Sequence, residues 1–272
     1  MSKPRTFLAT VAYDGTAYGG WQFQANAISV QQKFEEALSK VDGIRVPAVG
    51  SGRTDSGVHA EGQCVSFTLL NWRPEADRLV PAINRHLPRD ISVLSCRETL
   101  VTFHAQRHAL AKRYVYRIRV AKSPDPFRGL YHWRVVWPLD LDAMRQASRY
   151  LMGEHDFASF QSNGSPRKST VRTIKDFDFS SADELAGQDL SIIIEANGFL
   201  YNMVRNIVGT IIEIGRGKQP AEWMERVLLA HDRTVAGDTA PPHGLCLLHV
   251  SYDDHWFLDQ FSTCQPALTV SK

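Results

Sequence analysis

The order of strand-like and helix-like segments is the feature of this 272-residue sequence that most restricts its fold. Residues 6–13 are rich in β-branched and aromatic side chains and end at Asp14-Gly15, which predicts a strand closed by a turn. Ser29-Val-Gln-Gln32 has the form of a capping box and precedes apolar residues at helical spacing (Val30, Phe34, Leu38 and Val41). Similar segments continue to a last predicted strand at residues 245–252, without strict β-α-β alternation. This order favours an α+β fold with a mostly antiparallel central sheet and helices on one face.

The predicted elements form two groups that meet near residues 100–111. We therefore expect an N-terminal α+β subdomain over residues 1–105, a C-terminal α+β subdomain over residues 106–252, and a tail over residues 253–272. Helices are predicted near residues 74–86, 141–152, 200–214 and 220–231, in addition to the one that follows Ser29. With the helices on one face, the other face of the sheet is expected to carry the binding cleft.

Composition excludes several classes of protein. Hydrophobic residues make up 43% and charged residues 22%, as in an ordinary globular protein and unlike a disordered or fibrous one. No apolar run reaches the roughly 20 residues that cross a bilayer, and no signal peptide is recognisable, so we expect a cytoplasmic protein. The four cysteines form no Cys-x-x-Cys pair, which favours reduced thiols in the core (Cys64, Cys96, Cys246 and Cys264).

A glycine-rich segment at residues 50–62 surrounds Asp55, and two readings of this aspartate stay open. Glycines let the backbone approach a ligand closely, and the positive charge of Arg53 could keep the carboxylate ionised as a nucleophile or base. The other reading is an Asp-Ser-Gly turn in which the side chain bonds its own backbone. A phosphate-binding P-loop is excluded, because the Gly-Lys-Ser/Thr ending is missing.

The predicted strand at residues 113–120 combines aromatic and basic side chains. Tyr114 and Tyr116 share one face with Ile118, whereas the arginines share the other (Arg113, Arg117 and Arg119). Residues 107–134 hold eight basic residues and one acidic residue, although the whole chain carries only +2. Base stacking with phosphate contacts would explain this pattern, but core tyrosines and a solvated charged face explain it too.

Two further signals concern an arginine and the histidines. Arg205 interrupts the apolar stripe of the helix predicted at 200–214, where it could pair with an acid, bind phosphate or lie exposed. His104 and His108 are four residues apart, but no His-Glu-x-x-His motif occurs. We expect no metal site.

Several ordered segments together resemble the tRNA pseudouridine synthase A family. They include Tyr13-Asp-Gly-Thr-Ala-Tyr-Gly-Gly-Trp-Gln22, Gly52-Arg-Thr-Asp-Ser-Gly-Val-His-Ala60 and Lys112-Arg-Tyr-Val-Tyr-Arg-Ile118. Further matches are Asn84–Ile91, Gly153–Phe157, Ala196–Phe199, Met203–Gly209 and Ala240–Leu245, so the similarity runs from Tyr13 to about His249. The most diagnostic of these is Gly-Arg-Thr-Asp.

The resemblance implies a specific chemistry and site. Such an enzyme breaks the N1–C1′ bond of uridine, turns the base and rejoins it through C5, without a cofactor, usually at tRNA positions 38 to 40 in the anticodon stem-loop. It implies two similar ferredoxin-like or RRM-like halves and a homodimer. Asp55 would be the catalytic aspartate and would pair with Arg205, and Arg205 or Arg53 would keep it charged. Four residues would contact the substrate (Tyr114, Leu245, Lys112 and Arg113). An inactive RRM-like RNA-binding module is the alternative.

Two positions depart from the family pattern. Ser56 stands where alanine usually follows the aspartate, a small change that the site should tolerate. Gln106 occupies the place of a family arginine, and Arg107 follows it. Because a slip of one residue in a strand reverses the side-chain direction, neither residue inherits that RNA contact.

Overall fold

The computed structural model describes residues 3–162, 164, 169–184 and 187–258. Its centre is one sheet in the strand order β4-β1-β3-β10-β5-β9-β8-β7, with β2 paired to β3 and β6 paired to β5. The strands span, in chain order, Arg5–Tyr13, Ala48–Gly50, His59–Leu69, Ile91–Thr99, Ala111–Val120, Trp133–Val135, Gly153–Asp156, Val171–Glu184, Gly187–Ala196 and Leu245–Ser251. Only the β3–β10 and β5–β6 pairs are parallel among the described strands. The expected α+β class and mostly antiparallel sheet are therefore confirmed.

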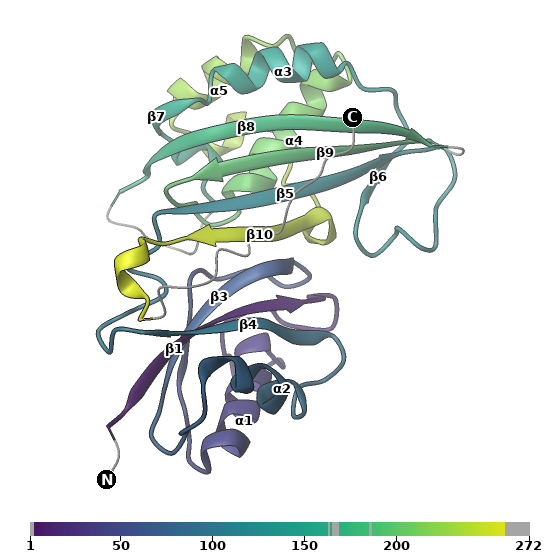
Figure 1. The fold of residues 1–272 in the computed structure, drawn as a ribbon. Helices are drawn as coiled ribbons and strands as arrows, with labels where there is room; N and C mark the ends of the chain where they lie inside the picture. Colours follow the sequence, from purple (N-terminus) through teal and green to yellow (C-terminus); the bar gives the residue numbers. More distant parts are fainter. Residues whose placement is uncertain (1–2, 163, 165–168, 185–186, 259–272) are drawn as a thin grey trace.

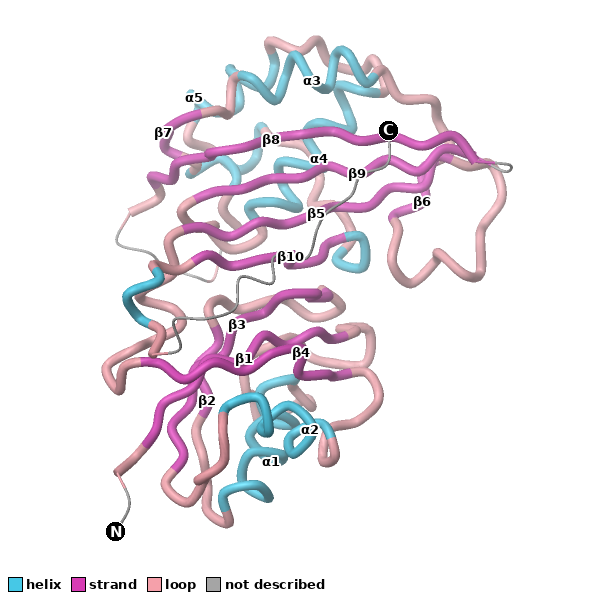
Figure 2. The backbone as a smooth tube through the Cα atoms, in the orientation of Figure 1, coloured by secondary structure: helices cyan, strands magenta, loops and turns pink. Residues whose placement is uncertain are grey.

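The helices gather at the two ends of this sheet, as Figures 1 and 2 show. Helices α1 (Val30–Asp42) and α2 (Leu79–Asn84) lie beside β1 and β4. Helices α3 (Leu141–Arg149), α4 (Met203–Gly215) and α5 (Trp223–Ala230) lie at the other end, beside β8 and β9. Strands far apart in the sequence meet in the middle, where β3 and β10 pair.

Helix α1 forms as its sequence predicts. The Oγ of Ser29 accepts a hydrogen bond from the backbone N–H of Gln32, and Gly43 ends the helix in the left-handed conformation at φ 77°. Val30, Phe34 and Leu38 are buried. The ring of Phe34 packs edge-on against Phe67 of β3, with ring centroids 5.8 Å apart. Burial of this apolar stripe attaches the helix to the sheet.

Helix α4 begins later than the apolar pattern suggests. The pattern starts at Leu200, but Asn202 adopts a left-handed conformation at φ 59° and helical geometry begins at Met203. Periodicity cannot detect such a residue, because it reports side-chain character and not backbone angles. The late start fixes the direction in which the first turn of α4 presents Arg205.

The join between β3 and β10 is short and tight. Only Cys246–His59 and Leu247–Ala60 are in register. A Cβ on Gly62 would lie 2.1 Å from the carbonyl oxygen of Leu248, so this close approach requires glycine. Polar contacts reinforce the join: Arg117 pairs with Glu61 at 2.6 Å, and the phenol of Tyr131 donates to Asp14 at 2.8 Å.

The connecting segment at residues 100–110 packs with residues that follow β10. The ring of Phe103 contacts Tyr252 and Trp256, with centroids 5.2 and 5.7 Å apart. Residues 104–107 form a turn, so strand alternation does not govern the direction of Gln106 or Arg107. The first residues of the expected tail at 253–272 pack here, while residues 259–272 lie outside the described residues.

Candidate active site

The loop that carries Asp55 connects β2 to β3 and is anchored at Thr54. The Oγ1 of Thr54 bonds the phenol of Tyr13 at 2.8 Å, and its carbonyl accepts from the N–H of Trp21 at 3.0 Å. Gly20, at φ 98°, passes so close that a Cβ there would lie 2.6 Å from the Thr54 carbonyl oxygen. These contacts fix the backbone immediately before Asp55.

A buried amide supports the start of the same loop, and sequence reasoning missed it. The side chain of Gln63 is fully buried, accepts from the Oγ of Ser51 at 2.7 Å and donates to the carbonyl of Gly52 at 2.9 Å. The Nζ of Lys112 donates to the carbonyl of Ser51 at 2.7 Å. An amide at the start of the strand predicted at residues 63–70 was the available signal, since buried polar groups need partners.

Asp55 itself faces Arg205 of α4. The Nη1 of Arg205 lies 3.5 Å from the Oδ2 of Asp55, with side-chain exposures of 15% and 26%. Burial raises the pKa of the Asp55 carboxyl above its usual value, and the positive charge of Arg205 opposes this rise. The loop and the first turn of α4 therefore place a mostly buried carboxylate against a single guanidinium.

The guanidinium of Arg205 is held on two further sides. Its Nε donates to the carbonyl of Ala240 at 2.7 Å, and its Nη1 donates to the Oδ1 of Asn202 at 2.9 Å. Because a guanidinium is planar, these two bonds fix the plane of the group and the position of Nη1. The same Nη1 is the atom that lies 3.5 Å from the Oδ2 of Asp55.

Arg53 does not take part in this ion pair. Its side chain is exposed, and its Nε donates to the Oε1 of Gln22 at 3.1 Å. Of the two arginines expected to hold Asp55 charged, the structure brings only Arg205 to the carboxylate, because Arg53 leaves the loop in another direction.

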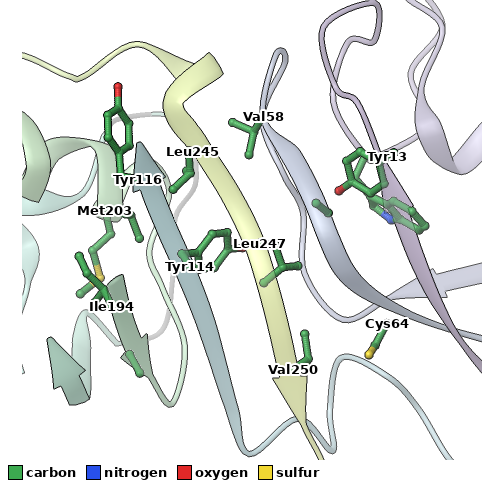
Figure 3. Packing of buried hydrophobic residues seen from close by; sticks show 14 of the residues in the cluster. Tyr13, Val58, Cys64, Tyr114, Tyr116, Ile194, Met203, Leu245, Leu247 and Val250 are labelled. Carbon is green, nitrogen blue, oxygen red and sulfur yellow. The ribbon is translucent and has the colours of Figure 1, made fainter. Parts of the chain in front are cut away.

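Tyr114 and Leu245 lie on the neighbouring strands β5 and β10. Leu245 of β10 is in register with Tyr116 of β5, so it shares a face with Tyr114 and Tyr116 (Figure 3). The ring of Tyr114 meets Phe199 edge-on at 5.1 Å. Burial raises the pKa of the Tyr114 phenol far above its usual value, with a smaller contribution from the charge of Asp55. Tyr114 is therefore a neutral, buried neighbour of Asp55.

Tyr116 belongs to the core. It is fully buried, and its phenol donates to the carbonyl of Pro241 at 2.8 Å. The reading of an aromatic strand face as packing is thus correct for Tyr116. Tyr114, two residues earlier, lies nearer the loop that carries Asp55.

The arginines of β5 lie on the opposite face and are paired with carboxylates. Arg113 bonds Asp176 at 3.1 Å and Arg119 bonds Asp189 at 2.8 Å. The expected cleft on the face without helices stays a prediction. Arg205 projects from the first turn of α4, so its ion pair with Asp55 lies where this helix begins.

His104 and His108 have a structural role. The Nδ1 of His108 accepts from the backbone N–H of His104, and its ring stacks on Trp256 at 3.9 Å. Among the described residues, no group of three His, Cys, Asp or Glu side chains could hold a metal ion. Within the same part of the chain, no helix is long and apolar enough to cross a membrane.

Ser56 has a hydrogen-bond partner, and the described cysteines lie in the core as expected. The Oγ of Ser56 donates to the carbonyl of Tyr18 at 3.1 Å, so the hydroxyl that replaces a methyl group has a partner. The three described cysteines are buried free thiols (Cys64, Cys96 and Cys246). Cys264 lies outside the described residues.

Comparison with known proteins gives a consistent result. A family model described as tRNA pseudouridine synthase matches residues 9–106 and 147–253. A tRNA pseudouridine synthase A of Thermoanaerobacter sp. (strain X514) is 42% identical over 248 residues, which is 91% of this chain and 100% of the relative. A tRNA pseudouridine synthase A of Chlamydia muridarum is 40% identical over 257 residues, which is 93% of this chain and 95% of the relative.

Similarity to solved structures is much weaker. The structure of an H/ACA RNP bound to a substrate RNA containing 2'-deoxyuridine has 13% identity and a TM-score of 0.33. The match covers 76% of this chain and 44% of that one. An overlap this slight carries no argument about the site.

Proposed function

This chain belongs to the tRNA pseudouridine synthase family, whose members are isomerases acting on tRNA, and from that premise we propose that Asp55 is its catalytic aspartate. The reaction breaks the N1–C1′ bond of a uridine, turns the uracil and joins its C5 to C1′. The observation that carries the proposal is the ion pair between Asp55 and Arg205, at 3.5 Å and mostly shielded from solvent.

The electrostatics of Asp55 suit this role. A nucleophile or base must be ionised, whereas burial favours the neutral acid. Arg205 counters burial and lowers the pKa of Asp55. A carboxylate with few competing water molecules also stabilises a cationic sugar strongly as the glycosidic bond breaks.

The environment of Tyr114 favours separate roles for Asp55 and Tyr114. Loss of the C5 proton needs a base, and a phenol whose pKa is raised by burial is not ionised near neutral pH. We assign the proton transfer to Asp55 and the contact with the uracil ring to Tyr114. Leu245, on the next strand, is the apolar contact for the same base.

The target uridine must leave its stem before Asp55 can reach C1′. We propose uridines 38 to 40 of the anticodon stem-loop as targets, because the family similarity covers nearly the whole chain. Lys112 bonds the loop at Ser51 and is placed to hold both loop and RNA. Arg113 lies on the other face, so its proposed contact is with RNA backbone away from the target.

The arrangement of the two helix groups supports a two-subdomain chain. We propose division at residues 105 and 106, with two similar ferredoxin-like halves contributing Asp55 and Arg205 from opposite sides. We further propose a homodimer working in the cytoplasm.

Tritium release tests the proposed targets. The full chain is incubated with tRNA transcripts labelled at C5 of uridine, because joining C5 to C1′ expels that hydrogen. We expect release from a transcript with uridines at 38 to 40 and none after their replacement by cytidine. Equal release from both transcripts would refute the target assignment, and no release from any tRNA would favour the RNA-binding module.

A further inference from the structure

The backbone before α4 adopts a conformation that an ordinary helix start does not need. Asn202 has φ 59° and ψ 7°, in the left-handed region that non-glycine residues seldom occupy. An asparagine at this position normally has extended backbone angles and caps the helix with its side chain. Here the side chain makes no capping bond, although the Asn202 carbonyl still accepts from the N–H of Asn206.

The amide of Asn202 bonds two other groups instead. Its Oδ1 accepts from the Nη1 of Arg205 at 2.9 Å, and its Nδ2 donates to the Oγ of Ser162 at 3.1 Å. The guanidinium settles which end of the amide faces it, because it has only donors, whereas the Ser162 hydroxyl can accept or donate. The oxygen meets the cation, as the charges require.

The opposite edge of Arg205 is held by a buried network. Its Nε donates to the carbonyl of Ala240. The adjacent Thr239 donates through Oγ1 to the Oδ1 of Asn206 at 2.7 Å, and the side chain of Asn206 is fully buried. The carbonyl of Ala240 is thus a fixed acceptor, and Asn202 is the second support of the same guanidinium.

We propose that Asn202 is a positioning residue for the isomerisation. Its strained left-handed backbone and its amide group orient Arg205 toward Asp55. Arg205 has two fixed acceptors and one target, and without Asn202 its Nη1 loses the bond that aims it. The proposal rests on the assignment of Asp55 and Arg205 as the catalytic pair.

Glycine is the informative substitution. Asn202→Gly keeps the left-handed backbone at no steric cost and removes only the amide. One hydrogen bond to a charged group is lost, so we expect kcat to fall about tenfold. The KM for tRNA should change less than twofold, because Asn202 positions a catalytic pair and does not hold the RNA.

His231 offers a matched control. It is the other described non-glycine residue with positive φ, at 52°, and it ends α5 instead of starting α4. His231→Gly makes the same kind of backbone substitution, and we expect kcat to stay within twofold of the unmodified chain. An equal loss in both variants would identify a general backbone effect and overturn the proposal.

A double-mutant cycle tests whether Asn202 acts through Arg205. Asn202→Gly should lower kcat about tenfold in the unmodified chain and should lower it no further in an Arg205→Ala background. An undiminished loss in that background, or unchanged kcat in the single variant, would overturn the proposal. If Asn202→Gly fails to fold, Ser162→Ala serves in its place, with a smaller loss in kcat that must also vanish without Arg205.

Asp55→Asn, measured in parallel, separates this proposal from the one on which it rests. An active Asp55→Asn enzyme would refute the catalytic pair itself. An inactive one, together with normal kcat in Asn202→Gly, would refute only the role of Asn202.

Discussion

Replacing Arg205 by alanine measures how the charge of Asp55 is maintained. The two groups lie 3.5 Å apart, and their side chains are 15% and 26% exposed. At an effective dielectric constant of about 20, unit charges at this distance attract by about 5 kcal/mol. Because both retain some contact with water, we expect about 3 kcal/mol of catalytic stabilisation to be lost. That loss corresponds to a fall in kcat on the order of 100-fold.

The pH profile of Arg205→Ala shows in which direction Arg205 shifts the pKa of Asp55. Asp55 acts as an anion, so activity falls as the pH drops through its pKa. Arg205 lowers that pKa, and its removal therefore raises it. In single-turnover pseudouridine formation between about pH 5 and 9, the acidic limb of Arg205→Ala should move to higher pH.

Arg53→Ala is the matched control, because it removes the same charge from the loop that carries Asp55. Arg53 bonds Gln22 and not Asp55, so its acidic limb should stay in place and kcat should change less than about threefold. Equal shifts in the two variants would mean that Asp55 senses only the overall positive charge. An unshifted limb in Arg205→Ala would refute the reasoning outright.

Three other outcomes follow from the same structure. Burial raises the folded-state pKa of Asp55, so its ionised form disfavours folding above that pKa. Asp55→Asn should therefore raise the melting temperature by about 1–3 °C at pH 7. Calorimetry should find that this gain shrinks toward about pH 4, where the carboxyl becomes protonated in the folded and the unfolded chain. A Cβ on Gly209 of α4 would lie 1.7 Å from the carbonyl oxygen of Asp238, so Gly209→Ala should lower the free energy of unfolding in urea by about 1–3 kcal/mol. In the control Gly198→Ala, the nearest atom to the new Cβ lies at 3.6 Å, so the loss should be well under that. Equal losses in the two variants would contradict this account of the packing. In a Cys264→Ser background, iodoacetamide at about pH 8 should label no cysteine until the chain is unfolded. Burial raises the pKa of the Cys64 and Cys246 thiols to about 12 and also shields Cys96 from the reagent. Labelling of the folded chain, read by mass spectrometry, would contradict that burial.

Local patterns in the sequence were sufficient for most helices and strands and for the fold class, but not for the short strands β2 and β7. The capping box at Ser29 and the stripe of Phe34 and Leu38 encode α1 directly, since the signals and the structure involve the same few residues. Alternation in β5 likewise separates Tyr114 from Arg113. Such signals are readable because they depend only on neighbours along the chain.

Contacts between distant segments could not be predicted in the same way. The residues alone left both Arg53 and Arg205 open as partners of Asp55, and only the family resemblance pointed to Arg205. The fold brings Arg205 of α4 to Asp55, while Arg53 bonds Gln22. The late start of α4 depends on one backbone angle at Asn202, which the apolar periodicity does not contain.

The most direct test of the central claim is tritium release from C5-labelled tRNA by Asp55→Asn. Asparagine keeps the size of the side chain and removes its charge, and tRNA binding can be measured on the same preparation. We expect no release above background, with the Kd for tRNA within about threefold of the unmodified chain. Release at the unmodified rate by a folded, tRNA-binding Asp55→Asn protein would contradict the assignment of Asp55 as the catalytic aspartate.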